Sequence, residues 1–106
     1  MNLQHLYYFQ TLADELHYHR ASEKLYISQP SLTYAIKELE KELNTKLFVK
    51  KGKNIQLTND GKLFLEHVNL SLKILDDGIE LLKQKRKSMF LFYRQLFVNS
   101  FPLFLI

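Results

Sequence analysis

The fold is decided by residues 18–43, which read YHRASEKLYISQPSLTYAIKELEKEL. A short helix is expected over 18–26, because apolar side chains four residues apart share one helix face. Ser28 suits the N-cap of a second helix, and Pro30 is tolerated only in a first turn, where its missing backbone N–H would have no intrahelical partner. The pattern therefore predicts two helices joined by a short turn.

The second of these helices should bury one face and present another. The buried face is marked, at steps of three and four residues, by Leu32, Ile36, Leu39 and Leu43. The early turns also carry small and polar side chains that let a backbone approach base edges: Ser31, Thr33 and Tyr34. Gln29 can form two hydrogen bonds with adenine, and Lys37 can reach a phosphate or a guanine. This helix is therefore the candidate recognition helix of a helix-turn-helix.

A further helix is expected before these two. The side chain of Asn2 can accept a backbone N–H of a first turn, and an apolar pattern of helical spacing continues to about Glu15. The apolar side chains of that pattern are Leu3, Leu6, Phe9, Ala13 and Leu16. One face of this helix should therefore belong to the core.

Residues 47–57 place β-compatible side chains on either side of a Lys-Gly-Lys-Asn tip, which predicts a short hairpin. The hairpin lies in a stretch without acidic residues and carries Lys50, Lys51 and Lys53. Lysines at this place would lie against the DNA backbone or in the minor groove, where each neutralised phosphate adds affinity by releasing counterions. The alternative interpretation of such a charge run is a solvated surface.

A long helix should follow, because Thr58 can cap a helix that begins at Asn59. Apolar residues then recur at alternating steps of three and four, which is typical of a helix that pairs with another helix. The residues assigned to dimerisation on this pattern are Leu65, Val68, Leu72, Leu75, Ile79 and Leu82. A second row is expected to pack back on the helix's own domain: Leu63, Leu70 and Ile74. Gly78 should weaken the helix by about 1 kcal/mol relative to alanine.

Composition limits the chain to one small folded domain with an appended element. Of the 106 residues, 46% are hydrophobic and 25% are charged, a balance that argues against intrinsic disorder. The expected divisions are a DNA-binding domain over 1–58, a dimerisation helix over 59–88 and an apolar tail over 89–106. Polar residues and a proline interrupt the tail, so we do not expect it to insert into a membrane.

Several classes of function are not expected. Without cysteine the chain has no disulfide, thiolate metal site or cysteine nucleophile. His17 and His19 have no carboxylate trio beside them, which favours ordinary surface or core positions over a metal site. Asp76 and Asp77 are adjacent on a helix and point apart, so they do not form a catalytic pair. We therefore expect no enzyme activity, no cofactor and no metal, and the absence of a signal-like start favours a cytoplasmic location.

Residues 19–40 resemble the helix-turn-helix of LysR-type transcriptional regulators. The resemblance continues through the post-helix leucine, the Leu-Phe strand, the wing glycine and the start of the linker helix, at Leu43, Leu47-Phe48, Gly52, Leu57-Thr58 and Gly61. It implies a mainly α fold: a winged helix-turn-helix of three helices and a two-stranded β-hairpin wing, followed by a long dimerisation helix. It also implies DNA contacts from the wing and from Gln29, Pro30, Ser31, Thr33 and Tyr34, and Arg20 in the matched stretch is added to them.

The expected function is that of a bacterial, sequence-specific transcriptional regulator that binds double-stranded DNA as a homodimer, with residues 29–42 in the major groove. The alternative is a truncated interaction module that forms heterodimers with a full-length regulator without productive DNA binding. Tyr34 departs from the long polar residue frequent in the family, and Lys50 and Lys53 replace its arginines, which keeps phosphate attraction but loses the bidentate fork. Nothing in 89–106 resembles the family's effector-binding domain, so no small-molecule effector site is expected in this chain.

Overall fold

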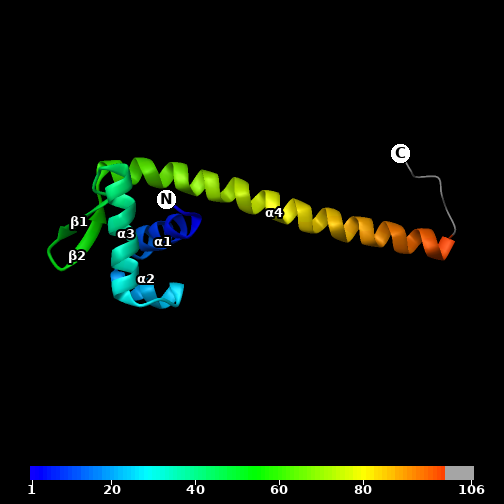
Figure 1. Cartoon of the computed structure of the whole chain (residues 1–106), viewed down its shortest axis with the longest axis horizontal. Helices are drawn as coiled ribbons and strands as arrows, with labels where there is room; N and C mark the ends of the chain where they lie inside the picture. The colour runs from blue at the N-terminus through cyan, green and yellow to red at the C-terminus, as the bar shows by residue number, and fades with distance from the viewer. Residues whose placement is uncertain (100–106) are drawn as a thin grey trace. The chain divides into compact units, whose positions relative to one another are not determined.

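The computed structural model describes the backbone of residues 1–99 (Figure 1). It describes the side chains of residues 1–87, 89, 91 and 94. The elements follow in the order α1 (Leu3–Glu15), α2 (Tyr18–Leu25), α3 (Gln29–Leu43), β1 (Phe48–Lys51), β2 (Asn54–Leu57) and α4 (Asn59–Asn99). Two compact units divide the chain between Ser71 and Leu72. The first unit contains a winged helix-turn-helix, so the predicted fold class is confirmed.

Side-chain caps begin three of these helices at the predicted residues. Asn2 Oδ1 accepts the backbone N–H of His5, and Ser28 Oγ accepts that of Ser31. Thr58 Oγ1 accepts the backbone N–H of Gly61 at 2.9 Å. Each bond satisfies a donor that a first helical turn leaves without a partner, so local chemistry is enough to place these helix starts. α2 ends one residue earlier than predicted.

The core of the first unit lies where α1, α2 and α3 meet the hairpin. Its fully covered large side chains are Phe9, Leu12, Leu32, Ile36, Leu39 and Leu47. The ring of Phe9 lies 5.6 Å from that of Phe48 and 5.4 Å from that of Phe64, which joins α1 to β1 and to the start of α4. The expected core position of Leu3 is wrong, because that side chain is 47% exposed, whereas Leu12, which the predicted pattern did not include, is fully buried.

β1 and β2 pair antiparallel, with Phe48 opposite Leu57 and Lys51 opposite Asn54. Gly52 adopts φ +64° at the tip, a conformation that glycine takes without steric cost. The carboxylate of Glu40 accepts the backbone N–H groups of Leu47 at 2.7 Å and Phe48 at 3.3 Å. This carboxylate therefore fastens the beginning of the wing to α3.

α4 is longer than expected. It runs unbroken through Gly78 to Asn99, whereas the sequence predicted an end near residue 88. The last residues of the expected apolar tail, 100–106, lie outside the described part of the chain. Among the described residues, no helix combines the length and apolar character needed to cross a membrane.

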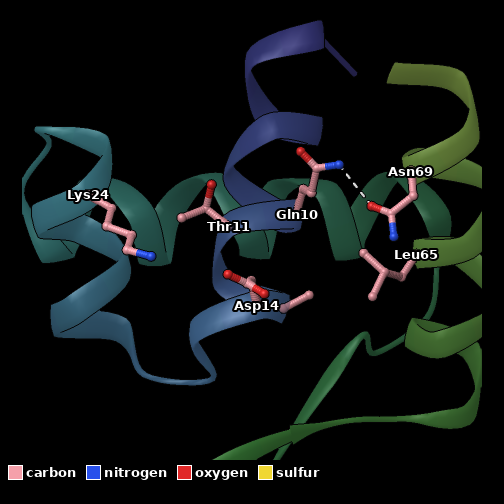
Figure 2. A pocket seen from close by; sticks show the side chains of 7 residues that line it. Gln10, Thr11, Asp14, Lys24, Leu65 and Asn69 are labelled. Carbon is pink, nitrogen blue, oxygen red and sulfur yellow. Dashed lines mark hydrogen bonds between the residues drawn. The ribbon is translucent and has the colours of Figure 1, made fainter. Parts of the chain in front are cut away.

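Within the first unit, the burial of the two apolar rows of α4 differs from what the sequence predicted. Val68 is only 3% exposed, while Leu63 and Leu70 are each 59% exposed. The side chain of Gln10 on α1 donates a 2.8 Å hydrogen bond to Asn69, and Leu65 lines the cleft beside this bond (Figure 2). The side of α4 that carries Leu65 and Asn69 therefore faces α1, which corrects the expectation that Leu63 and Leu70 pack inward.

In the second unit, Leu72 is 2% exposed, so its side chain is already covered within one chain. Ile74, expected to face its own domain, is 63% exposed. Three further members of the predicted dimerisation row are exposed: Leu75, Ile79 and Leu82. Two members of the predicted dimerisation row, Val68 and Leu72, are therefore buried within a single chain. The later members Leu75, Ile79 and Leu82 remain exposed and available to a partner.

Glu15 gives the contact between α1 and α2 a dependence on pH. Its carboxylate lies 2.5 Å from the ammonium of Lys24 and 3.5 Å from the guanidinium of Arg20. The hydrogen bond from Lys24 is the main cause that holds the pKa of Glu15 below its ordinary value of 4.5. A carboxyl with a lowered folded-state pKa stabilises the fold above its unfolded pKa and loses that contribution as the pH falls through the folded value.

We therefore expect the free energy of unfolding to decrease as the pH is lowered below about 4.5. This decrease should be smaller in Glu15→Gln, which lacks the titrating carboxyl group. Urea unfolding followed by circular dichroism between about pH 6 and pH 3 measures both. Glu23→Gln is the control, since that carboxylate is exposed and, among the described residues, pairs only with His19. Identical pH profiles for Glu15→Gln and the unaltered chain would contradict the prediction.

Candidate nucleic-acid interface

The first two turns of α3 present the predicted contact residues to solvent. Tyr34 is 65% exposed, while Leu32 and Ile36 on the opposite face are 0% and 1% exposed. A shallow cleft of about 550 Å³ is lined by Gln29, Pro30, Thr33, Tyr34 and Lys37. The structure therefore brings five of the predicted residues together on one surface.

Ser31 is exposed on the same turns, and its hydroxyl is held in place. Ser28 Oγ donates to Ser31 Oγ at 2.8 Å and accepts the backbone N–H of Ser31. Because the Ser31 oxygen accepts in this pair, its own hydroxyl hydrogen is left to donate elsewhere. The predicted contact residue is thus oriented by the cap of the helix that carries it.

The wing reaches the N-terminal end of α3. A smaller cleft of about 200 Å³ is lined by Gln29 of α3 together with Lys53 and Asn54 of the hairpin. Lys50, Lys51 and Lys53 are all exposed. Of the predicted lysines, Lys53 therefore lies beside the end of α3 that carries the polar contact residues, and the other two are exposed on the same hairpin.

Arg20, one of the predicted DNA-contact residues, already forms contacts within the protein. Its guanidinium donates to the backbone carbonyl of Glu15 at 3.3 Å and lies 3.5 Å from the carboxylate of the same residue. The side chain is still 60% exposed. A contact between Arg20 and DNA would compete with this pairing, which weakens the expectation for this residue.

Two histidines that the sequence analysis set aside lie at this surface. His17 and His19 line the 200 Å³ cleft beside Lys53. The signal that could have found them is position, because both stand at the start of the first helix of the helix-turn-helix, the element that crosses the DNA backbone in such proteins. Among the described residues, no group of three or more histidine or acidic side chains could hold a metal ion.

Tyr18, between these histidines, plays a structural part. Burial raises the pKa of its phenol above 10.0, and the negative charge of Glu40 raises it further. The phenol therefore remains neutral throughout the physiological range.

A pair of helices joined by a tight turn, with an exposed polar second helix and a basic wing beside its start, defines the class of winged helix-turn-helix DNA-binding proteins. Residues 3–62 match the family described as "Bacterial regulatory helix-turn-helix protein, lysR family". The chain belongs to this family of DNA-binding transcriptional regulators.

Known relatives agree with this assignment. AlsR of Bacillus subtilis, a HTH-type transcriptional regulator, is 40% identical over 81 residues, which cover 76% of this chain and 27% of AlsR. BudR of Klebsiella aerogenes is 40% identical over 80 residues, covering 76% of this chain and 56% of BudR. The chain thus spans about a quarter of the length of AlsR and about half that of BudR.

Solved structures show the same fold. The crystal structure of the BenM_DBD/catB site 1 DNA complex matches with a TM-score of 0.76 and 31% identity, over 79% of this chain and 93% of that one. Full-length CbnR complexed with its target DNA matches with a TM-score of 0.72 and 28% identity, over 78% of this chain and 29% of that one. Both of these similar proteins were crystallised with DNA.

Proposed function

We propose that this chain is a sequence-specific DNA-binding regulator in which α3 enters the major groove and the wing lies against the DNA backbone. The observation that carries the proposal is that Gln29, at the start of α3, lines one cleft with the other α3 contact residues and a second cleft with Lys53 of the wing. Gln29, Thr33 and Tyr34 supply groups for base edges, while the lysines beside them supply affinity that does not depend on sequence.

The decisive experiment is selection of duplexes from a random pool, followed by anisotropy titrations of the selected and a scrambled duplex at two salt concentrations. We expect preference for the selected sequence and a steep loss of affinity as salt rises. A chain that binds neither duplex at low salt would refute the proposal. If such a chain still pairs with a full-length regulator and reduces its DNA binding, the interaction module is the correct alternative.

Tyr34→Ala tests base readout directly. Tyr34 is exposed and lines the cleft on α3, so its loss should cost about 1–3 kcal/mol on the selected duplex and little on scrambled DNA. Competition titrations on both duplexes measure the difference. Tyr26→Ala is the matched control, because Tyr26 is 95% exposed in the turn between α2 and α3 and is not among the residues that line this cleft. An equal loss on both duplexes would argue against base readout by Tyr34.

We further propose that two chains pair through the later part of α4. Its exposed apolar side chains are between 40% and 67% exposed: Ile74, Leu75, Ile79, Leu81 and Leu82. Covering a large apolar side chain is worth roughly 1.5–3 kcal/mol, so together these residues favour a partner helix. Pairing would present two recognition helices to half-sites about one helical turn apart, or a multiple of it.

Leu75→Asp with Ile79→Asp should therefore give monomers that bind a half-site only weakly. Sedimentation equilibrium at about tens of micromolar measures the mass, with the apolar end 100–106 removed to avoid aggregation. Gln84→Asp with Lys87→Gln changes the net charge by the same amount on the opposite side of the helix, and this control should remain dimeric. A monomeric unaltered chain would contradict the proposed pairing.

A further inference from the structure

The cleft between the start of α2, the start of α3 and the wing tip contains a hydrogen-bond donor that the fold does not use. The backbone N–H of Arg20 donates to Nδ1 of His17 at 3.2 Å, so His17 is the N-cap of α2. A neutral imidazole that accepts on Nδ1 carries its proton on Nε2. No acceptor for this Nε2–H is found among the described residues, and the ring lines the cleft.

The second histidine of the cleft is engaged differently. His19 Nε2 lies 3.1 Å from the carboxylate of Glu23, one turn further along α2. Its ring therefore already has an acceptor on its own helix. Of the two histidines that line the cleft, His17 thus has an Nε2–H without an acceptor among the described residues, whereas Nε2 of His19 lies beside a carboxylate.

Lys53 completes the cleft from the side of the wing. Its side chain is exposed and has no acidic partner within the described residues. A neutral N–H donor and an ammonium on two residues that line one small cleft are suited to a singly charged oxyanion such as a phosphodiester. The cleft also adjoins Gln29, so an anion held there would sit beside the helix that reads the bases.

We propose that this cleft seats one backbone phosphate of bound DNA, held by the Nε2–H of His17 and the ammonium of Lys53. The proposal rests on the proposed function, since it requires α3 to lie in the major groove. Phosphate contacts of this kind set the register of a recognition helix on the duplex. Because His17 acts as a neutral donor, it adds affinity without releasing a counterion, whereas Lys53 contributes to the salt dependence.

His17→Ser provides the main test, because serine is a good N-cap and keeps the start of α2 while removing the ring donor. We expect about a fivefold loss of affinity for the selected duplex with an unchanged slope of log affinity against log salt. Lys53→Gln should lower that slope by about one. His67→Gln is the matched control and should change affinity less than about twofold, because this exposed histidine lies on α4 and is not among the residues that line the cleft.

The phosphate is located by replacing single phosphates of the selected duplex with neutral methylphosphonate. When the methylphosphonate replaces the phosphate that His17 contacts, His17→Ser should cause no additional loss of affinity, because the contact is already weakened in the unaltered chain. Titrations without and with inorganic phosphate at equal ionic strength distinguish a free ion from DNA. Competition by inorganic phosphate that disappears in His17→Ser would place the free ion and the DNA phosphate in the same cleft and would support the proposal.

Unchanged affinity in a folded His17→Ser chain, or an equal loss in His67→Gln, would overturn the proposal. Unfolding midpoints and circular dichroism establish that each variant is folded. In those cases the unaltered chain still binds the selected duplex and the proposed function stands. A chain that binds no duplex at all overturns both.

Discussion

Gly61→Ala should strongly destabilise the winged domain. A Cβ at this position would lie 2.2 Å from the carbonyl oxygen of Leu47 and 3.0 Å from a methyl carbon of Leu57. The carbonyl cannot easily retreat, because it accepts the backbone N–H of Thr58 at 3.0 Å and Leu47 is itself fully buried. Since a backbone clash has no flexible side chain to relieve it, we expect a loss of at least about 3 kcal/mol in the free energy of unfolding.

Thermal and urea unfolding measure this loss. Gly78→Ala is a matched control in the same helix, because a Cβ there would meet nothing within 4 Å. Alanine at that position should instead stabilise α4 by about 1 kcal/mol. Equal effects of the two substitutions would show that the approach of α4 to the wing is not the reason for a glycine at position 61.

The triple change Lys50→Gln, Lys51→Gln and Lys53→Gln should produce the largest loss of DNA binding. If each lysine neutralises about one phosphate, the slope of log affinity against log salt falls by about two to three per chain. The loss in affinity should then be roughly a few hundredfold at about 0.1 M salt and should nearly vanish towards 1 M. The fold should be unaffected, because the three side chains are exposed on the hairpin.

Anisotropy titrations across a salt series measure the slope. Lys41→Gln with Lys62→Gln is the control, since these exposed lysines lie on the last turn of α3 and on α4 rather than on the wing. This pair should change the slope by less per lysine than the wing does. An unchanged slope in the triple variant would remove the wing from the interface.

The helix starts and the buried faces of the helices in the winged domain could largely be predicted from residues close together in the sequence. The caps at Asn2, Ser28 and Thr58 are where the sequence predicted them, because a capping side chain bonds backbone groups only two or three residues away. The helical period likewise separated buried Leu32 from exposed Tyr34. These predictions need no knowledge of what lies far along the chain.

The cap of α2 shows where local reasoning was incomplete. His17 performs the function usually given to serine or aspartate, and a histidine before a helix does not by itself reveal which ring nitrogen is used. The cleft beside it is formed by residues from α2, α3 and the wing. Neither the donor nor its surroundings could be derived from spacing alone.

The sequence by itself thus determined the order of helices and hairpin, the candidate recognition helix and the basic hairpin, because each follows from contacts between near neighbours or from periodicity. Only the tertiary structure decided which apolar row of α4 is covered, that Glu40 fastens the wing, and that Arg20 pairs with Glu15. The row with Leu65 and Val68 and the row with Leu63 and Leu70 are similar in composition, so the sequence predicts an amphipathic helix whichever of the two rows is buried. The choice between them depends on the surface that α1 presents to Leu65 and Asn69, and contacts between residues distant in sequence leave no periodic signal.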